Sequence, residues 1–325
     1  MMTDDIQAWR RARRPIAFFF GAFGDHLLAR PGILALQRIF EGRLSFAGTP
    51  DAWERFYPDA GFRSVHAIRM GAANNAFAFD PAQFETFASD FDAFINLNWW
   101  ESDDNLDIVR RFPDIPHLRL ASHGGRLAPL TDTAHMADSA FVIARYLDDR
   151  LHIDDFATLP PPSTRSIALC RQLRDRLPAH ARLLVVHTHT KSDKEWDADR
   201  FRSVLERFLD SHDDHVAVVI DPDDRGLDFG RHERRVFSIE GMDLAATTAL
   251  VATADLFLGV DSYFLHVADF ARVPTVGLFG PTSPALWGCR FTRARHVAAK
   301  SMSDMGVDAV LDHLHALARI ERVSA

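Results

Sequence analysis

The sequence is poor in cysteine and contains no metal-binding spacing. Its 325 residues include two cysteines, Cys170 and Cys289, which stand far apart and form no C-x-x-C pair. Neither a disulfide framework nor a structural zinc site is indicated, so we expect a reducing, cytoplasmic compartment. The sixteen histidines include no H-E-x-x-H or zinc-finger spacing, and no metal or other cofactor is predicted.

Long apolar runs are also missing. The longest stretches, such as residues 16–20, are far shorter than the ~20 residues that span a bilayer. Residues 1–15 mix acids, arginines and a tryptophan and lack the apolar core of a signal peptide. We interpret this segment as a solvated leader, with at most a peripheral membrane contact. Its small basic cluster consists of Arg10, Arg11, Arg13 and Arg14.

An excess of positive charge is absent as well. The chain has 37 basic and 45 acidic residues, a formal net charge of −8. Because neutralising phosphates supplies most nucleic-acid affinity, a nucleic-acid partner is not expected. A G-x-G-x-x-G turn is missing too, so an NAD-type oxidoreductase is not indicated.

What is present is an α/β pattern of alternating strands and helices, which predicts parallel sheets wrapped by helices. The length suits two domains. The proline run Leu159–Ser163 marks the boundary, giving domains of residues 1–160 and 161–325. The last predicted helix, 307–317, can pack back across the boundary onto the first domain.

The predicted elements follow this alternation. Strands are expected at 16–20, 44–47, 65–69, 91–97, 117–120, 183–187, 216–220, 256–260 and 275–279. Helices are expected at 51–56, 105–111, 134–147, 166–177, 199–209, 244–252 and 262–270, and from about Leu27 to Ile39. In that last helix, Pro31 either kinks the chain or marks the first turn.

The first candidate site is the turn Gly21–Asp25 between a buried strand and a helix. Its two glycines allow a ligand to approach backbone N–H groups closely. Asp25 stands at the carboxyl end of the strand, where it can act as a general base. From the residues alone, capping the following helix is an equally good interpretation.

The second candidate is the polar loop that follows the strand 183–187. Its hydroxyl and ammonium groups can donate to a diphosphate, and they belong to Thr188, Thr190, Lys191, Ser192 and Lys194. His187 and His189 lie two apart on a strand, which also fits a metal, but no third ligand is evident. A solvated loop is the plainer alternative.

The third candidate joins Asp261, Ser262 and His266 to a Gly280-Pro-Thr282 turn. A strand ends at Asp261, and the helix opened by Ser262 offers unpaired N–H groups and a positive dipole end to an anion. His266 lies one helical turn beyond Ser262. The alternative is a capped helix with a core histidine.

These segments together resemble glycosyltransferase family 9, the lipopolysaccharide heptosyltransferases and their relatives. The matching residues are Gly24, Asp25, Leu27 and Pro31; His187 to Lys194, Trp196 and Phe201; Gly259, Asp261, Ser262, His266 and Ala268; Val273 to Thr275; Leu278 to Thr282, Pro284 and Trp287. The similarity runs through most of the chain in the family's order.

The resemblance implies a GT-B fold, with two Rossmann-like, doubly wound parallel-sheet domains facing a central cleft. The first would bind the acceptor and the second a nucleotide-sugar donor, ADP-heptose by family default. Transfer would be inverting and independent of metal.

The resemblance also implies roles for individual residues. Asp25 would be the general base, Lys194 would contact the diphosphate, and Asp261 would bind the sugar hydroxyls. Ser262 would hold phosphate. The remaining donor-binding residues would be Thr188, Thr190, Lys191, Met242 near the nucleobase, Tyr263, and His266 as a support.

Two residues depart from the family pattern. Tyr263 replaces a glycine and Asp269 replaces a small residue, and either can reshape the sugar site. A catalytically silent relative that binds a nucleotide sugar, or assembles with another protein, is the alternative function. The acceptor can be a glycan, a lipid-linked sugar or a small molecule.

Overall fold

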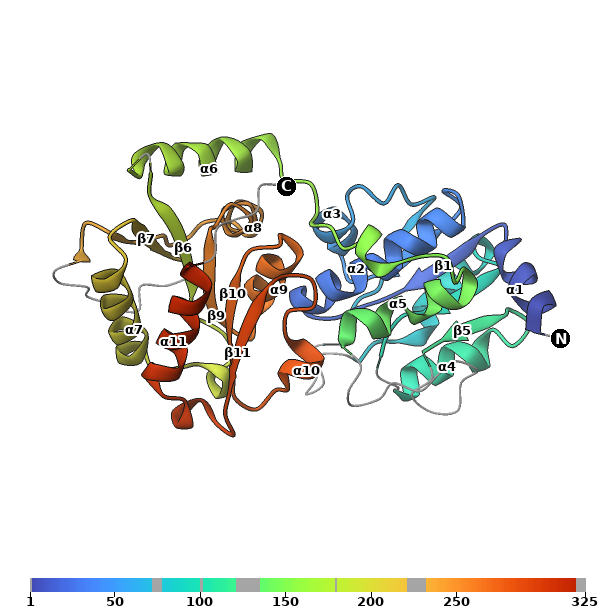
Figure 1. Cartoon of the computed structure of the whole chain (residues 1–325). Helices are drawn as coiled ribbons and strands as arrows, with labels where there is room; N and C mark the ends of the chain where they lie inside the picture. The colour runs from blue at the N-terminus through green and yellow to red at the C-terminus, as the bar shows by residue number, and fades with distance from the viewer. Residues whose placement is uncertain are drawn as a thin grey trace. The chain divides into compact units, whose positions relative to one another are not determined.

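The computed structural model describes residues 2–71, 78–99, 102–120, 135–178, 180–220 and 232–319. The chain forms two compact units, Met1–Pro161 and Pro162–Ala325. In each, a parallel sheet is covered by helices, as Figure 1 shows. The α/β class predicted from the alternating pattern is confirmed.

The first unit contains a five-stranded parallel sheet in the order β3-β2-β1-β4-β5. Its strands are β1 (Pro15–Phe18), β2 (Ser45–Gly48), β3 (Val65–Ala67), β4 (Ala93–Asn96) and β5 (His117–Arg119). Its helices are α1 (Met2–Arg10), α2 (Phe23–Ile39), α3 (Ala52–Phe56), α4 (Asp103–Arg111) and α5 (Met136–Leu147), with 3₁₀ turns at Pro81–Asp90 and Ile153–Asp155. Residue 134, where the α5 prediction began, lies outside the described residues.

The core on one face of this sheet is rich in phenylalanine. The ring of Phe18 in β1 lies 5.0 Å from that of Phe84 and 5.2 Å from that of Phe79, both edge to face. Such offset aromatic pairs add to the stabilisation that comes from burying their area. The central strands β1 and β4 are fully buried, which explains their unbroken apolar sequence.

The N-terminal segment is partly folded, although Arg11, Arg13 and Arg14 of its basic cluster are exposed, as the solvated interpretation predicts. Residues 2–10 form helix α1, in which the Trp9 side chain is buried. The guanidinium of Arg10 lies 3.4 Å from the carboxylate of Asp148, after helix α5. Arg43 donates to the backbone carbonyls of Arg10 and Ala12. The tryptophan supplies the apolar contact that an acidic and basic segment otherwise lacks.

Helix α2 continues through Pro31, which therefore does not mark its first turn. Next to it, a Cβ on Gly32 would lie 2.5 Å from the carbonyl oxygen of Ala140, so the glycine lets α5 pack closely against α2. Arg30 of the same helix is fully buried and donates to the carbonyls of Phe56, Thr158 and Leu159. This contact fastens the segment that leads out of the unit.

The second unit contains a six-stranded parallel sheet in the order β11-β10-β9-β6-β7-β8. Its strands are β6 (Arg182–His187), β7 (His215–Val219), β8 (Val236–Ser238), β9 (Leu256–Val260), β10 (Thr275–Phe279) and β11 (Ala294–Ala298). Its helices are α6 (Thr164–Arg176), α7 (Ala198–Ser211), α8 (Leu244–Ala252), α9 (Tyr263–Phe270), α10 (Pro284–Trp287) and α11 (Val307–Ala318), with 3₁₀ turns at Ser192–Lys194 and Met302–Asp304. If β6 is taken as strand 1 and the others follow in chain order, the sheet from β8 to β11 has the order 3-2-1-4-5-6. This is the strand order of the nucleotide-binding Rossmann fold.

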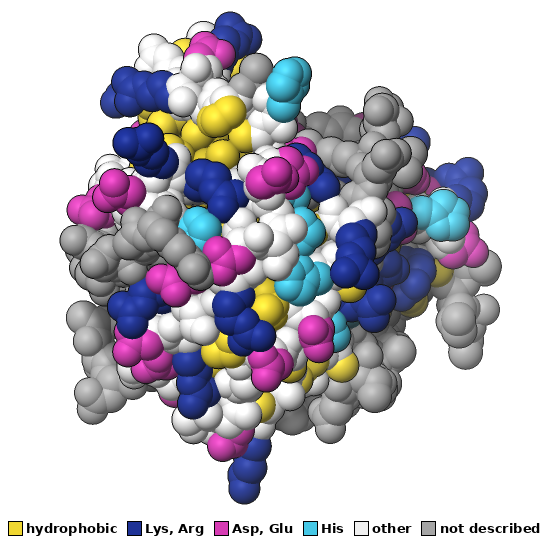
Figure 2. Space-filling model, turned by 60° about the vertical axis from the view of Figure 1, so that its left-hand side comes forward, with side chains coloured by type: hydrophobic (Ala, Val, Ile, Leu, Met, Phe, Trp, Pro, Cys, Tyr) yellow, Lys and Arg dark blue, Asp and Glu magenta, His cyan; other side chains and the backbone are white. Residues whose placement is uncertain are grey.

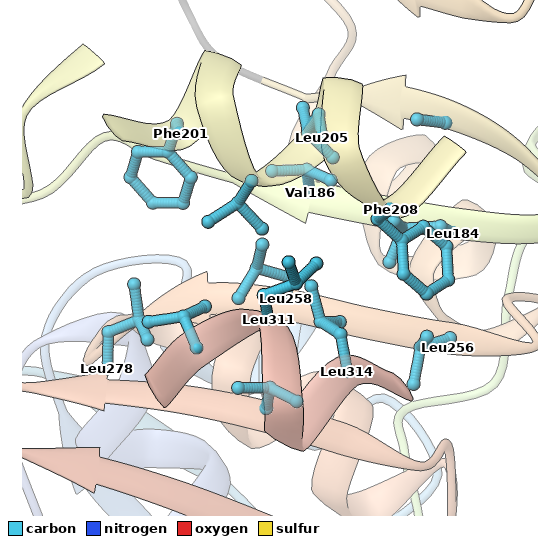
Figure 3. Close-up of a cluster of buried hydrophobic side chains, with 14 of the residues drawn as sticks. Leu184, Val186, Phe201, Leu205, Phe208, Leu256, Leu258, Leu278, Leu311 and Leu314 are labelled. Carbon is cyan, nitrogen blue, oxygen red and sulfur yellow. The ribbon is translucent and has the colours of Figure 1, made fainter. Parts of the chain in front are cut away.

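Helices α7 and α11 lie side by side on one face of this sheet. Figure 3 shows Leu205 and Phe208 of α7 and Leu311 and Leu314 of α11 directed into a shared cluster with Leu258 of β9. All five side chains are almost entirely buried. The apolar face of the last helix is therefore used within the second unit. Helices α6, α8 and α9 cover the opposite face (Figure 1).

None of the described helices has the length and apolar character needed to cross a bilayer.

Candidate functional site

The second unit gathers most of the candidate residues where its strand order reverses. Strands β6 and β9 are neighbours at that point, and His187 pairs in register with Gly259. The polar loop after β6 therefore emerges beside the Asp261-Ser262 turn after β9. In doubly wound sheets, ligands bind at this switch point, outside the carboxyl ends of the strands.

Asp261 is the centre of this group. Its carboxylate is buried, and one oxygen, Oδ2, accepts from the Lys194 ammonium at 2.7 Å and from the Thr282 hydroxyl at 2.6 Å. The Thr190 hydroxyl donates to the Asp261 backbone carbonyl at 3.3 Å. Three loops, which follow β6, β9 and β10, thus converge on one residue. A buried carboxylate needs such partners, because an isolated charge would be costly to desolvate.

Ser262 precedes helix α9 but does not cap it with its side chain. Its backbone is extended, and its hydroxyl lies 3.1 Å from Nδ1 of His187 instead. The His187 ring also packs edge to face on Phe264, with ring centres 4.9 Å apart. The first N–H groups of α9 are therefore not satisfied by the serine, which is the arrangement that suits an anion.

The rest of the polar loop has varied exposure. Thr188 is buried at the end of β6, while Lys191 is exposed at the start of the next turn. Nδ1 of His189 lies 3.1 Å from Oε1 of Glu195, the oxygen that also faces the backbone N–H of Thr190 at 3.4 Å. His187 and His189 thus have different partners, Ser262 and Glu195.

Tyr263, the departure from the family glycine, stands on the side of α9 that faces α8. Its hydroxyl lies 3.1 Å from the hydroxyl of Thr248 in α8, and its ring packs against Phe264 at 5.2 Å. The tyrosine therefore links two helices beside the Asp261 cluster. His266, on the next turn of α9, is buried.

Met242 lies just before α8 and is half-buried. Its carbonyl accepts from the Thr247 hydroxyl at 3.5 Å, while the side chain of Asp243 caps the helix by accepting from the backbone N–H of Ala246 at 2.8 Å. Gly241 has a φ of +65°, a left-handed conformation that favours glycine. This turn fixes where the Met242 side chain emerges.

Asp269, the other departure, has a structural role, which corrects the expectation that it reshapes the sugar site. The side chain is fully buried and accepts from three consecutive backbone N–H groups, those of Arg290, Phe291 and Thr292, at 2.7 to 2.9 Å. It holds the loop ahead of β11. Its carboxylate also contributes, after burial, to raising the pKa of the Cys289 thiol well above its usual value.

Asp25 belongs to the first unit, as the third residue of α2. Its Oδ2 accepts from the backbone N–H of Ala22 at 2.8 Å, so it stabilises the start of the helix from inside rather than from the N-cap position. A Cβ at Gly21 would lie 2.6 Å from the Cβ of Asp25, which explains the glycine. The side chain is half-buried, and its catalytic role stays a prediction.

A buried polar group that the sequence did not reveal lies beneath Asp25. Nδ1 of His26 lies 3.0 Å from the Tyr57 hydroxyl, which in turn donates to the His26 carbonyl at 3.1 Å. Burial lowers the pKa of His26 to about 3, so the ring is neutral. Burial also raises the pKa of Tyr57; Arg30 opposes this rise and Asp25 adds to it.

Thr282 is the functional candidate that the sequence reasoning missed. The Gly280-Pro-Thr282 turn was placed at the correct edge of the sheet, but its threonine was not singled out. The sequence feature that could have indicated Thr282 is a hydroxyl that follows a sharp turn, after the strand next to the one that ends at Asp261.

Comparison with known proteins gives a family match over the part of the chain that contains these residues. Residues 132–308 match the model of the family described as glycosyltransferase family 9 (heptosyltransferase). This range includes the whole Asp261 cluster. No curated protein sequence gives a significant match.

Solved structures share the fold over nearly the whole chain. A family 9 glycosyl transferase from Veillonella parvula has a TM-score of 0.72 at 15% identity, with 94% of this chain and 97% of that chain covered. The E. coli ADP-heptose lipopolysaccharide heptosyltransferase II gives 0.64 at 16%, covering 94% and 98%. The E. coli heptosyltransferase WaaC, solved with ADP, gives 0.64 at 16%, covering 94% and 99%. The fold is GT-B, as the resemblance predicted.

Proposed function

The chain belongs to glycosyltransferase family 9, and from this premise we propose that it transfers a heptose, with inversion and without a metal, from a nucleoside-diphosphate donor to an acceptor hydroxyl. The family membership makes it a glycosyltransferase. The observation that carries the finer proposal is the convergence of Lys194, Thr190 and Thr282 on Asp261 at the strand switch point.

The donor would bind in the second unit. Lys194 and Asp261 neutralise each other, and a diphosphate would give the ammonium a second anionic partner. Ser262 and the N–H groups that open α9 would hold the same phosphates. Sugar hydroxyls would donate to Asp261, whose second carboxylate oxygen still has acceptor capacity.

The remaining predicted donor contacts would lie around this centre. Thr188 and Thr190 would line the diphosphate site, with Lys191 reaching in from the exposed side of the loop. Met242 would lie near the nucleobase, and His266 would support α9 from within. Tyr263 would border the donor next to Ser262.

The chemical step would be a direct displacement. Asp25 takes the proton from the acceptor hydroxyl as its oxygen forms a bond to the anomeric carbon, while the bond from that carbon to the diphosphate oxygen breaks. Proton removal of this kind contributes about 10²- to 10⁴-fold in rate. The charge on the departing diphosphate would be stabilised by Lys194 and by the positive end of α9.

We propose ADP-heptose as the donor, because one related structure contains ADP and another contains ADP-2-deoxy-2-fluoro heptose. The acceptor would be a lipopolysaccharide-type glycan, met in the cytoplasm with at most a peripheral membrane contact. Acceptor contacts would come from loops of the first unit, because loops are the variable parts of a fold that carry binding residues.

The first test is calorimetric titration of ADP, UDP, GDP and dTDP in the presence of EDTA. We expect one diphosphate to bind, and Lys194→Ala to weaken it about tenfold or more, because a charge-assisted contact is lost. Lys300→Ala, at an exposed position in the same unit, is the matched control and should bind like the parent. A requirement for divalent metal would contradict the metal-independent mechanism.

A silent relative is the second candidate, motivated by Tyr263 in place of glycine. It predicts retained nucleotide binding with no turnover of any nucleotide sugar. Measuring the ADP that is formed from ADP-heptose, with and without acceptor, distinguishes the two functions.

A further inference from the structure

A cavity of about 330 Å³ lies in the second unit, on the face of the sheet that α6 and α8 cover. Part of its wall is almost entirely buried and consists of Leu183 of β6, Val218 of β7 and Leu250 of α8. Another part comes from Leu173 and Leu177 of α6, which are half-buried. The cavity therefore reaches from the apolar interior of the unit to its surface.

The size and lining of this cavity are those of a ligand site. Protein interiors are close-packed and leave few voids much larger than a water molecule. Small-molecule pockets measure about 300–1,000 Å³ and have mostly apolar walls with a few polar groups. Here the polar groups are Arg174, Arg176, Ser238 and Thr253, and the rest of the described lining is apolar.

The charge on the lining has one sign. Among the described residues that line the cavity, two are arginines and none is acidic, although the whole chain has a formal net charge of −8. The guanidinium of Arg174 donates to the Ala181 carbonyl at 2.8 Å and lies 3.6 Å from the carboxylate of Asp255, so it already has an anionic partner. Arg176 is exposed, which makes it the group that an anionic ligand can reach.

Apolar side chains are exposed to solvent around the same place. Ile167 of α6 is 44% exposed and Phe237 of β8, which lines the cavity, is 39% exposed. Figure 2 shows a hydrophobic patch bordered by Lys and Arg side chains at the top of the view, the level at which Figure 1 places α6. Exposed apolar surface rimmed by charged groups is typical of a binding site.

We propose that this cavity binds a single alkyl chain with a carboxylate head group, a ligand of the fatty-acid class. The chain lies against the leucines of α6, β6 and α8, and the carboxylate pairs with Arg176 at the surface. Guanidinium and carboxylate match in charge and in planar geometry. The Asp261 cluster contributes no residue to the described lining, so this site is separate from the proposed sugar transfer.

The test is calorimetric titration of decanoate into the full chain, below the concentration at which decanoate forms micelles. We expect saturable binding of one molecule per chain. Decyltrimethylammonium has the same chain with the opposite charge, and butyrate has the same head group with little chain. Each should bind about tenfold more weakly or less, because one loses the ion pair and the other the apolar contact.

Three variants locate the site. Leu177→Trp puts a larger side chain into the cavity and should weaken decanoate binding about tenfold or more. Arg176→Glu reverses the charge at the surface and should weaken it about tenfold. Arg171→Glu makes the same charge change at an exposed position of α6 that does not line the cavity, and it should bind like the parent.

Three results would overturn the proposal. The first is the absence of saturable decanoate binding to the parent chain. The second is equal affinity in the parent and in both Leu177→Trp and Arg176→Glu, which would place the ligand elsewhere. The third is binding to phosphatidylglycerol vesicles without binding of free decanoate, which would indicate a surface contact instead. Circular dichroism checks that the variants fold, and an unchanged affinity for the nucleotide shows that the donor site is unaffected.

Discussion

The ammonium of Lys194 lies 2.7 Å from Oδ2 of Asp261, although 67 residues separate them in the chain. The same oxygen accepts the hydroxyl of Thr282. A phosphate-binding cation and a sugar-binding carboxylate would thus be joined before either meets its part of the donor. A nucleotide sugar would then add its diphosphate to the Lys194 ammonium and its sugar hydroxyls to the other oxygen of Asp261, without breaking this pair.

Thr282 should matter for turnover through Asp261. Thr282→Val removes a hydrogen bond to a buried carboxylate and should lower kcat/KM with a nucleotide-sugar donor about tenfold. Thr282→Ser keeps the hydroxyl and should restore most of the activity. Steady-state kinetics of the two variants check this; equal losses in both would mean that the methyl group, not the hydroxyl, is needed.

The two interpretations of Asp25 can be separated by a pair of variants. Asp25→Asn keeps an oxygen that can accept from the Ala22 N–H but cannot remove a proton, so transfer should fall about 10²- to 10⁴-fold with nucleotide affinity unchanged. Asp25→Ala loses the helix contact as well and should also unfold more easily, by about 1 kcal/mol. If Asp25→Asn retains full activity in a transfer assay, the base assignment is wrong.

Asp269 should contribute to the free energy of unfolding rather than to the rate of sugar transfer. Asp269→Ala leaves three backbone N–H groups without their acceptor and should lower the free energy of unfolding by about 3 kcal/mol or more. Asp269→Asn retains one oxygen and should cost less. Thermal melts give the order of the three proteins, and an Ala variant as stable as the parent would contradict the structural role.

His26 should make the chain sensitive to acid. Its pKa is about 3 in the folded chain and about 6.5 when unfolded, so between these values the unfolded chain binds more protons. Its stabilising contribution is complete above about pH 6.5 and falls by about 1.4 kcal/mol per pH unit as the pH drops towards 3. Urea unfolding from about pH 7 to about pH 4 should show a steeper loss in the parent than in His26→Gln. Parallel curves would contradict the buried neutral ring.

Much of the fold could be predicted because the central strands are buried on both faces. The residues of β6 and β9 are continuous apolar runs, and those runs were recognised in the sequence. The edge strands β8 and β11 were missed, because Val236–Ser238 and Ala294–Ala298 are partly exposed and lack such runs. The helix α1 was missed since, among its described side chains, Trp9 is the one apolar group that is buried, and it lies in a run of charged residues.

The candidate site was predicted as separate segments rather than as a set of contacts. The Lys194–Asp261 contact depends on β6 lying next to β9, and strand order is a property of the whole sheet. The contacts of Asp269 are with backbone groups in a distant loop, which residue types do not reveal. Tertiary hydrogen bonds of this kind decide whether a polar residue can bind a ligand or instead stabilises the fold.

Arg30 holds the end of the segment that leads out of the first unit. Because its guanidinium holds the carbonyls of Thr158 and Leu159, the segment up to Leu159 is fixed to the first unit. The next residues, Pro160–Pro162, are three prolines in a row, in which ring closure fixes φ and leaves mainly ψ free to rotate. Replacing Arg30 would release Thr158 and Leu159 and so lengthen the part of this connection that is not held by the first unit.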